Sequence, residues 1–343
     1  MRALWVDQPQ VTGASAANLS IVLVDARAGV IEQSRRHTAI ASLLRIPHLV
    51  VAVNKMDLVG WSEQRFLEIR AQFEEFLPRL DIKDVKFIPL SALNGDNVVD
   101  PSPHMPWYAG PTLLGHLETV HIASDWNLNG FRLPVQWVNR PNHPTDLALH
   151  DFRGCSGQIA GGIVRTGQKI VALPAGLVTT VKQIWTFDGP VDEAFCPQSV
   201  TLVLEQDIDI SRGSMLIGLD HLPGASTDLH AEICWMHPRT LQAGKKYFLK
   251  HTTHTVQVVI TEIVNKLNMA TLDTEAAPAG LAVNDIGEVR LRSAKPLVFD
   301  GYATNRLTGS FILIEQGTNA TVAAGMLLPP LTVVKPENGD YVI

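Results

Sequence analysis

A short polar motif follows directly after an uninterrupted apolar segment in the first part of the chain. The apolar segment is Leu49 to Val53, and the residues that follow it are Asn54, Lys55, Met56 and Asp57. A continuous apolar run of this length is typical of a strand buried on both faces of a parallel α/β sheet. The polar residues would then lie just beyond the carboxyl end of the strand, where open α/β sheets bind their ligands.

The residue types in this motif suit the recognition of guanine. The carboxylate of Asp57 can accept two hydrogen bonds, one from the ring N–H and one from the exocyclic amine of the base. Adenine has no such pair of donors, so binding it would leave a buried carboxylate unpaired, which is heavily penalised. The amide of Asn54 can bond the purine edge, and the stem of Lys55 can lie over the ring. Taken alone, the motif also fits a surface turn after a core strand, because Asn and Asp are common turn residues.

A second motif of the same kind follows a later apolar segment. Lys86 to Leu90 reads as another short strand, and Ser91, Ala92 and Leu93 come directly after it. Asn-Lys-x-Asp and Ser-Ala-x, in this order after successive strands, are the two base-contacting motifs of GTPases, and the second supplies a backbone N–H aimed at the guanine carbonyl. We therefore assign GTP as the cofactor and predict that its base is contacted by Asn54, Lys55, Met56, Asp57, Ser91, Ala92 and Leu93.

Longer segments resemble one particular family of GTPases. The chain from about Thr12 to about Leu327 resembles the large subunit of the bacterial two-subunit sulfate adenylyltransferase. The residues that carry the resemblance are Asp25-Ala26-Arg27, Arg35-Arg36-His37, Asn54-Lys55-Met56-Asp57-Leu58-Val59, Pro134-Val135-Gln136-Trp137-Val138-Asn139-Arg140-Pro141 and Thr308-Gly309-Ser310-Phe311-Ile312-Leu313-Ile314. The resemblance implies a P-loop GTPase domain followed by two β-barrels, as in elongation factor Tu.

The resemblance also implies an activity, a cofactor and a partner. The family's large subunit binds GTP with Mg²⁺, hydrolyses it, and couples that free energy to a small subunit that binds ATP and sulfate. The small subunit joins these substrates into adenosine 5′-phosphosulfate and pyrophosphate in sulfate assimilation. In this chain Asp57 would select guanine, Asn54 and Lys55 would hold the base, and Ser91 with Ala92 would close over it. The resemblance implies a cytoplasmic heterodimer with the small subunit.

Of two motifs that a GTPase needs for the phosphates, the first is absent from the sequence and the second has only a formal match in the β-rich region. They are Gly-x-x-x-x-Gly-Lys-Ser/Thr, which cradles the phosphates, and Asp-x-x-Gly, which positions the metal. Gly244-Lys245 is followed by Lys246 instead of Ser or Thr, and the formal match at Asp151 to Gly154 lies in the β-rich region. We therefore interpret the chain as an N-terminally truncated member of the family. We predict no catalytic and no metal-binding residue in it, and we expect no GTPase activity from it alone.

Two other functions remain compatible with the sequence. The barrels could dock the small subunit as a non-catalytic scaffold, or they could bind tRNA as translation factors do. The formal net charge of −6 disfavours a nucleic-acid-binding surface, which would normally be basic. No apolar stretch approaches the roughly 20 residues needed to cross a bilayer, so no membrane association is expected. Cys155, Cys196 and Cys234 lack metal-ligand spacing and read as reduced thiols of a cytosolic protein.

The order of the predicted elements gives an α/β fold followed by an all-β region. Strands are predicted at 20–25, 49–53 and 86–90, and helices at 32–45, from 62 to 77 and from 111 to 120. Alternation of strand and helix implies a parallel sheet. After about Asp125 the spacing of apolar residues changes from the helical period to the two-residue period of β-strands. Gly, Pro and Asp separate these short segments, which indicates two small β-barrels.

The barrel region contains ten segments that read as strands. They lie at 133–137, 159–160, 169–173, 200–204, 215–219, 231–235, 247–250, 256–264, 289–291 and 311–314. The Pro223-Gly224 pair is a plausible boundary between the two barrels. The predicted domains are a truncated GTPase domain at 1–124, β-barrels at 125–222 and 223–330, and a C-terminal tail at 331–343.

Individual positions within the first domain carry predictions of their own. Ser62 is predicted to cap the second helix, whose buried face is Phe66, Ile69, Phe73 and Leu77. The third helix is predicted to begin with Pro111 at its first position, with a buried face of Leu113, Leu114, Leu117 and Val120. The strand at 20–25 is expected to form an open, apolar edge of the sheet.

Aromatic and histidine residues of the barrel region are predicted to be structural. Trp137 and Trp185 lie in strand patterns and are expected in the core. His251 and His254 are taken to lie on one strand, where residues three apart face opposite sides, so the pair is not expected to bind a metal.

Overall fold

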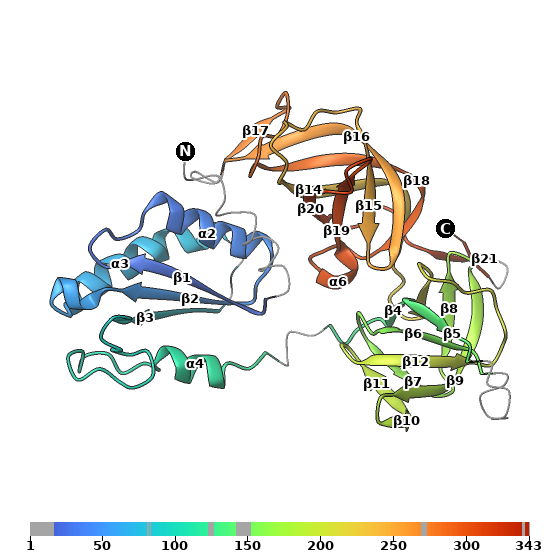
Figure 1. Ribbon diagram of the computed structural model, residues 1–343, viewed down its shortest axis with the longest axis horizontal. Helices are drawn as coiled ribbons and strands as arrows, with labels where there is room; N and C mark the ends of the chain where they lie inside the picture. The colour runs from blue at the N-terminus through green and yellow to red at the C-terminus, as the bar shows by residue number, and fades with distance from the viewer. Residues whose placement is uncertain are drawn as a thin grey trace. The chain divides into compact units, whose positions relative to one another are not determined.

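A computed structural model describes residues 17–80, 82, 84–122, 127–141, 152–268, 273–337 and 340–342. The chain divides into two compact units, one of residues 1–125 with the short segment 267–274, and one of residues 126–266 and 275–343. Figure 1 shows helices and a small sheet in the blue to teal part of the chain, and mainly strands in the part from green to red. The domain boundary predicted at 124/125 lies outside the described residues.

The first unit is built on a three-stranded parallel sheet. Its strands are β1 (Leu19–Asp25), β2 (His48–Asn54) and β3 (Asp84–Pro89), in the order β1-β2-β3. β2 lies in the middle, and every residue from Leu49 to Val53 is at most 1% exposed, as expected for a strand covered on both faces. The parallel sheet and its three predicted strands are therefore confirmed.

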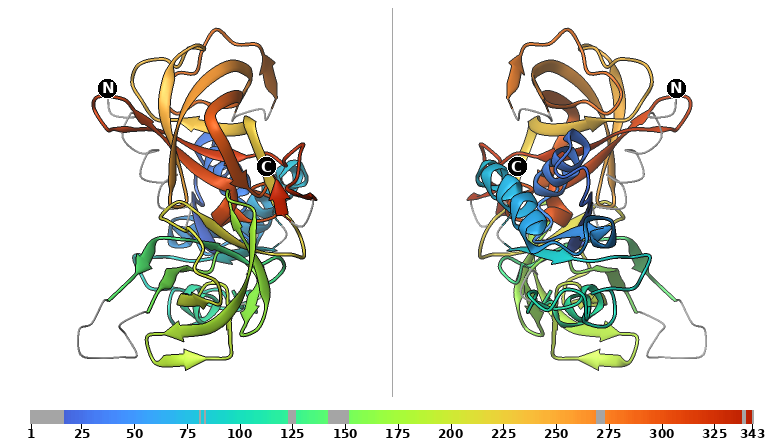
Figure 2. Two further views of the ribbon diagram at one scale, coloured as in Figure 1. Left: turned by 90° about the vertical axis from the view of Figure 1, so that its right-hand side faces the viewer. Right: turned by 90° about the vertical axis from the view of Figure 1, so that its left-hand side faces the viewer.

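Two helices pack against this sheet. They are α2 (Glu32–Leu43) and α3 (Glu63–Phe76), which lie above the sheet in Figure 1 and next to each other in the right-hand view of Figure 2. The predicted cap of α3 is confirmed, because Ser62 Oγ accepts a hydrogen bond from the N–H of Arg65 at 3.2 Å. The buried residues of α3 are Phe66, Ile69, Phe73 and Phe76. Phe76 takes the place predicted for Leu77, because the chain tightens there into the 3₁₀ turn η2 (Leu77–Arg79).

The third helix, α4 (Leu113–Thr119), differs from its prediction. Thr112 is its cap, with Oγ1 accepting from the N–H of Gly115 at 3.1 Å, so Pro111 lies before the cap and not at the first helical position. The predicted buried face is wrong, since no residue of α4 is buried. The helix has only seven residues, and of these only Leu113 packs against the hydrophobic cluster of the sheet.

The second unit begins with an antiparallel β-barrel. Its strands are β4 (Arg132–Pro134), β5 (Trp137–Asn139), β6 (Gly154–Gln158), β8 (Lys169–Leu173), β9 (Leu177–Thr186), β10 (Gly189–Val191), β12 (Ser199–Leu204) and β13 (Met215–Gly218). They follow the order β4-β13-β8-β9-β12-β6-β5, with β10 paired to β9. A separate pair joins β7 (Ile163–Arg165) to β11 (Glu193–Phe195). The core of this barrel includes Leu133, Ile170, Ile184 and Leu202.

The second β-barrel follows in the same unit. Its elements are β14 (Gly224–Trp235), β15 (Lys246–His251), β16 (His254–Leu267), β17 (Thr274–Ala276), β18 (Ile286–Phe299), α6 (Arg306–Gly309), β19 (Ser310–Glu315) and β20 (Thr321–Leu327). The order is β15-β19-β20-β14-β18-β16-β17, and a further pairing of β15 with β16 closes the ring. A short hairpin of β21 (Lys335–Glu337) and β22 (Asp340–Val342) follows in the predicted tail. The predicted succession of a parallel α/β sheet and two β-barrels is confirmed.

Two tryptophans predicted in the core of the first barrel lie on its outer surface. Trp137 is 67% exposed and Trp185 is 37% exposed. The strand register places Trp137, Ser156, Thr201 and Trp185 in one row across β5, β6, β12 and β9. Residues in one row point to the same face of a sheet, and the adjacent row faces the core. The core prediction is wrong because the apolar pattern of these short strands does not tell which row faces inward.

The two predicted strand histidines lie on different strands. His251 ends β15 and His254 begins β16, and they pair across a two-residue turn. The prediction of a single strand is therefore wrong. His251 is buried, with Nε2 2.7 Å from the carbonyl oxygen of Thr308, so the imidazole donates a hydrogen bond and is a core residue.

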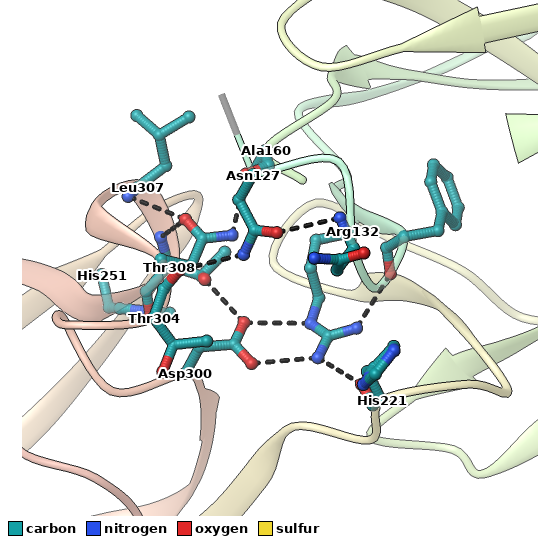
Figure 3. Close-up of polar contacts among 12 residues, drawn as sticks. Asn127, Arg132, Ala160, His221, His251, Asp300, Thr304, Leu307 and Thr308 are labelled. Carbon is teal, nitrogen blue, oxygen red and sulfur yellow. Dashed lines mark hydrogen bonds and ion pairs between the residues drawn. The ribbon is translucent and has the colours of Figure 1, made fainter. Parts of the chain in front are cut away.

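Polar side chains connect the two barrels, as Figure 3 shows. Arg132 of β4 donates to Asp300 twice, from Nε to Oδ2 at 3.0 Å and from Nη2 to Oδ1 at 2.9 Å. Thr308 Oγ1 donates to the same carboxylate at 2.7 Å. Asn305 Nδ2 donates to the carbonyl of Ala160 at 2.9 Å. Arg132 is buried, the side chain of Asp300 is only 11% exposed, and the hydrogen-bonding capacity of both is largely satisfied in this joint.

Candidate guanine-binding site

The two predicted motifs meet at the carboxyl edge of the three-stranded sheet. Asn54 is the last residue of β2, and Lys55 leads into the 3₁₀ turn η1 (Met56–Val59). Ser91 lies just beyond the end of β3. Because β2 and β3 are parallel neighbours, the segments that follow them emerge side by side. The structure therefore brings together residues that are more than thirty positions apart in the sequence.

Asn54 links the two motifs directly. Its Oδ1 accepts hydrogen bonds from the backbone N–H of Lys55 at 2.7 Å and from that of Ala92 at 3.0 Å. Lys55 adopts a left-handed conformation with φ of 65°, which is uncommon for a residue with a side chain. The Nδ2 amine of Asn54 makes no hydrogen bond to any residue that the structure describes, so it is available to the edge of a purine.

Asp57 retains acceptor capacity for a ligand. Its Oδ1 accepts a hydrogen bond from Ser91 Oγ at 2.7 Å, and Ser91 is completely buried. Within the described part of the chain, Oδ2 of Asp57 accepts no hydrogen bond, and the residue is half-buried. A carboxylate fixed through one oxygen and open at the other can still receive two donors, because each oxygen has two lone pairs. This is the acceptor pair that the ring N–H and amine of guanine require.

The backbone of the second motif offers one donor to a ligand. The N–H of Ala92 is used by Asn54, but the N–H of Leu93 donates to no described group. The side chain of Leu93 is 88% exposed, whereas the side chain of Met56 is buried and borders the site only through its backbone. The N–H of Leu93 is therefore the backbone donor of this motif that stays open to a ligand.

Asp25, which was not among the predicted site residues, holds Lys55 in place through its carboxylate. Lys55 Nζ lies 2.8 Å from Oδ2 of Asp25, the last residue of β1, which pairs with Asn54 in the sheet. Arg27 donates to the same carboxylate through Nη2 at 2.7 Å. Hydrogen bonds from Arg27 and then Lys55 hold the pKa of Asp25 far below its usual range, so the carboxylate is ionised at neutral pH. An acidic residue at the end of the strand next to the motif is the sequence signal that could have indicated it.

The described residues offer no metal centre. No group of three or more His, Cys, Asp or Glu side chains lies together among them. Asp151 of the formal Asp-x-x-Gly match lies outside the described residues, and Gly154 begins β6. The three cysteines are buried and form no disulfide, and burial raises the pKa of Cys155 and of Cys196 to about 11, so both thiols are protonated at neutral pH.

Two protein-family models match separate parts of the chain. The elongation factor Tu GTP binding domain matches residues 8–149, and the GTP-eEF1A C-terminal domain-like family matches residues 228–328. The first match covers both base-contacting motifs, and the second covers most of the second barrel. Both agree with the order of a GTPase domain followed by barrels.

Similar curated proteins define the family more closely. Sulfate adenylyltransferase subunit 1 of Teredinibacter turnerae is 45% identical over 330 residues, which are 96% of this chain and 69% of that protein. The chain belongs to the sulfate adenylyltransferase subunit 1 family. The subunit 1 protein of Bacteroides fragilis is 51% identical, with 93% of this chain and 65% of that protein covered. The bifunctional enzyme CysN/CysC of Rhodopirellula baltica is 50% identical, with 92% of this chain and 48% of that protein covered.

The chain spans about two thirds of the length of the Bacteroides fragilis protein (65%) and about half the length of the Rhodopirellula baltica protein (48%). Among solved structures, this chain is similar to Sup35 complexed with GMPPNP, with a TM-score of 0.55, 26% identity and 93% of this chain and 80% of that chain covered. Sup35 complexed with GDP gives a TM-score of 0.54 at 25% identity. None of the helices among the described residues combines the length and the apolar character that crossing a membrane requires.

Proposed function

We propose that this chain is the GTP-binding part of the large subunit of sulfate adenylyltransferase. In this proposal the large subunit couples GTP hydrolysis to the formation of adenosine 5′-phosphosulfate from ATP and sulfate in sulfate assimilation. The observation that carries it is the site at the ends of β2 and β3, where Asn54 bridges the two motifs and Asp57 keeps acceptors open for guanine. Forming the phosphosulfate anhydride has an unfavourable free energy, and hydrolysis of a second nucleotide, GTP, would supply the free energy that this step needs.

The base-binding residues divide the work of recognition among themselves. Asp57 selects guanine, because its acceptors match the ring N–H and the exocyclic amine, which adenine does not offer. Asn54 holds the purine edge through its Nδ2 amine. The stem of Lys55 lies over the ring while Asp25 fixes its ammonium group at 2.8 Å. GTP is thus the cofactor whose base this chain binds, and Mg²⁺ accompanies GTP in the family.

We infer that the 343-residue chain by itself does not hydrolyse GTP. Phosphoryl transfer depends almost entirely on positioning the phosphates and the metal ion. The sequence contains no Gly-x-x-x-x-Gly-Lys-Ser/Thr motif to do this. The expected result is guanine-nucleotide binding without turnover above background. Clear turnover by the purified chain, abolished by Asp57→Ala, would contradict the inference.

Equilibrium binding of a fluorescent guanine nucleotide tests the main proposal. The full chain is titrated with fluorescent GDP, and unlabelled GDP and ADP then compete for the site. Binding that GDP displaces and ADP does not is the expected result. Equal displacement by the two nucleotides, or no binding at millimolar concentrations, would exclude a guanine-specific site.

A second candidate function is a docking scaffold for the small, ATP- and sulfate-binding subunit. The observation that favours it is the outer face of the first barrel, where Trp137, Trp185 and Phe187 are exposed, Phe187 completely. Exposed aromatic residues are enriched at protein interfaces, where they act as anchors. The partner is inferred from the name of the relatives, because "subunit 1" implies a second subunit.

Co-purification with the small subunit tests the scaffold. The double variant Trp137→Ser, Trp185→Ser is expected to lose most of the bound partner, because two large anchors disappear from one face. Phe248→Ser is the matched control, since Phe248 of the second barrel is as exposed as Trp185, at 37%. Retention of the partner by the double variant would place the interface elsewhere.

A further inference from the structure

A buried carboxylate, that of Asp96, links the two loops that carry the predicted base-contacting motifs. Asp96 is 7% exposed, and its Oδ2 accepts a hydrogen bond from Trp61 Nε1 at 3.0 Å. Its Oδ1 accepts from Ser102 Oγ at 2.6 Å and lies 3.3 Å from His104 Nδ1. Burial raises the pKa of Asp96, but the hydrogen bonds from Ser102, Trp61 and His104 outweigh that effect and lower the pKa overall. Asp96 is therefore ionised at neutral pH.

Asp96 and Trp61 complete a ring of hydrogen bonds around the two motifs. Trp61 follows the first motif, and its N–H donates to the carbonyl of Met56 at 2.8 Å. Asp96 follows the second motif, and its carbonyl accepts from the N–H of Ser91 at 3.1 Å. Ser91 in turn donates through Oγ to Asp57 at 2.7 Å. Because the bond from the indole to the carboxylate closes the ring, neither loop can shift without breaking a hydrogen bond to a buried group.

Trp61 is held in a backbone conformation that a bulky residue rarely adopts. Its φ is 52°, in the left-handed region. Its indole stacks on the imidazole of His104, with ring centroids 4.3 Å apart, and its carbonyl accepts from Trp107 Nε1 at 3.1 Å. Strained conformations persist only where the surrounding structure holds them, and they gather at ligand-binding sites. The contacts of Trp61 therefore maintain a particular shape of the first loop.

We propose that Asp96, acting through Trp61 and Ser91, is a positioning residue that fixes Asp57 in the orientation that reads guanine. The inference rests on the proposed function of the site. Asp96 is turned toward the protein and is not among the groups that face the base. Asp96 therefore affects the choice between guanine and hypoxanthine, the base of inosine, because hypoxanthine lacks the exocyclic amine that guanine donates to Asp57. A firmly oriented Asp57 favours GDP over inosine diphosphate, and a loosely held one does not.

Binding of GDP and of inosine diphosphate to the full chain tests this role in two variants. Asp96→Asn keeps the shape of the side chain but replaces one acceptor oxygen with an N–H donor. Trp61→Phe keeps an aromatic ring on His104 and removes the indole N–H. Each variant is expected to weaken GDP binding about tenfold and to move the ratio of the two affinities toward one. Asp100→Asn, which changes an exposed carboxylate in the same loop, is the matched control and should bind like the wild type.

Amide hydrogen exchange gives a second measurement that needs no nucleotide. Asp96→Asn is expected to speed exchange at residues 56–61 and 91–95 while the rest of the chain exchanges as before. If the wild type binds GDP and Asp96→Asn keeps its affinity and its base ratio, or loses both nucleotides equally, the positioning role is overturned and the proposed function stands. If the wild type binds no GDP, the proposed function fails, and unchanged exchange in Asp96→Asn would separately overturn the positioning role.

Discussion

Among individual residues, Asn54 and Asp57 show how hydrogen bonds within the protein can fix a side chain while leaving part of it open to the proposed ligand. Oδ1 of Asn54 is committed to two backbone N–H groups, which leaves its amine for the ligand. Oδ1 of Asp57 is held by Ser91, which leaves the rest of the carboxylate to accept from the base. A side chain fixed in advance loses less conformational entropy on binding, so the same contacts give higher affinity.

Replacing Asp57 with Asn should change which base the site prefers. The amide offers one acceptor and one donor, which match the carbonyl of xanthine in place of the amine of guanine. We expect the affinity for GDP to fall roughly 100-fold or more and the affinity for xanthosine diphosphate to rise above it. Competition binding with the two diphosphates measures this. Glu74→Gln on the exposed face of α3 is the control, and an unchanged preference in Asp57→Asn would remove Asp57 from base recognition.

His251 should make the stability of the barrel unit depend on pH. Burial lowers the pKa of His251 to about 4, although its hydrogen bond to Thr308 acts in the opposite direction. The unfolded chain binds a proton at this histidine more readily than the folded chain does. The free energy of unfolding therefore has its full contribution from His251 above the unfolded pKa of about 6.5. That contribution decreases as the pH falls from 6.5 toward 4. The loss from this group is on the order of 3 kcal/mol, and below pH 4 its contribution no longer changes.

Denaturant unfolding between pH 7.5 and pH 4.5 measures this effect. His251→Gln is the matched variant, because its amide can still donate to the carbonyl of Thr308 but does not titrate. The wild type is expected to lose more stability than the variant across this range. Parallel curves for the two proteins would show that His251 does not take up the proton on unfolding.

At the level of elements, the order of the three strands determines which loops can form the site. The parallel neighbours β1, β2 and β3 end at one edge, so Asp25, Asn54 and Ser91 come within reach of each other through backbone pairing alone. β1 is an edge of this sheet among the described residues, as the sequence led us to expect. Its residue Leu23 is 64% exposed, whereas Val22 beside it is buried.

A charge on the exposed face of β1 should reduce self-association of the chain. Edge strands with exposed apolar side chains pair with other strands, and an added lysine opposes this. We expect Leu23→Lys to lower light scattering of the purified chain at equal concentration without loss of secondary structure. Val22→Lys is the contrasting variant, because the same charge at a position 2% exposed should unfold the first unit. Equal scattering by Leu23→Lys and the wild type would show that β1 does not drive association.

At the scale of the whole molecule, the second unit consists of two barrels that share polar and apolar contacts. The buried pair of Arg132 and Asp300 joins them, with Thr308 donating to the same carboxylate (Figure 3). A small apolar cluster does the same, since it combines Val171 and Ile217 of the first barrel with residues of the second. The two barrels should therefore unfold together.

Breaking the buried ion pair should destabilise this joint strongly. Asp300→Asn leaves the guanidinium of Arg132 buried without its counter-ion, and a change of this kind costs about 3–5 kcal/mol. Calorimetric unfolding should show a lower transition temperature for the barrel unit, or two transitions in place of one. Arg292→Gln is the control, because it breaks an exposed pair with Asp228, and such pairs contribute at most about 1 kcal/mol. Similar effects of the two substitutions would show that Asp300 is not essential to the joint.

The sequence by itself determined the parts of this protein whose signals are local. The apolar run before Asn54 indicated a strand buried on both faces, and Ser62 with the spacing after it indicated α3, because burial and capping act over a few residues. The Asn-Lys-x-Asp and Ser-Ala-x motifs, together with the resemblance of longer segments, indicated the family and the order of its domains.

Only the tertiary structure decided which distant residues meet. Asp25 and Asp96 come close to the predicted site residues because strand pairing and a loop bridge bring them there, and neither belongs to the Asn-Lys-x-Asp or Ser-Ala-x motif. Trp137 points away from the core because its row of paired residues lies on the outer face of the sheet. His251 and His254 are paired on neighbouring strands because a turn separates them. β20 had no counterpart among the predicted strands, because the Ala, Ala and Gly at its centre have low strand propensity and the segment becomes a strand through pairing with its neighbours. Local sequence patterns report burial and capping, whereas contacts between distant residues depend on register and chain path, which are fixed only when the whole sheet forms.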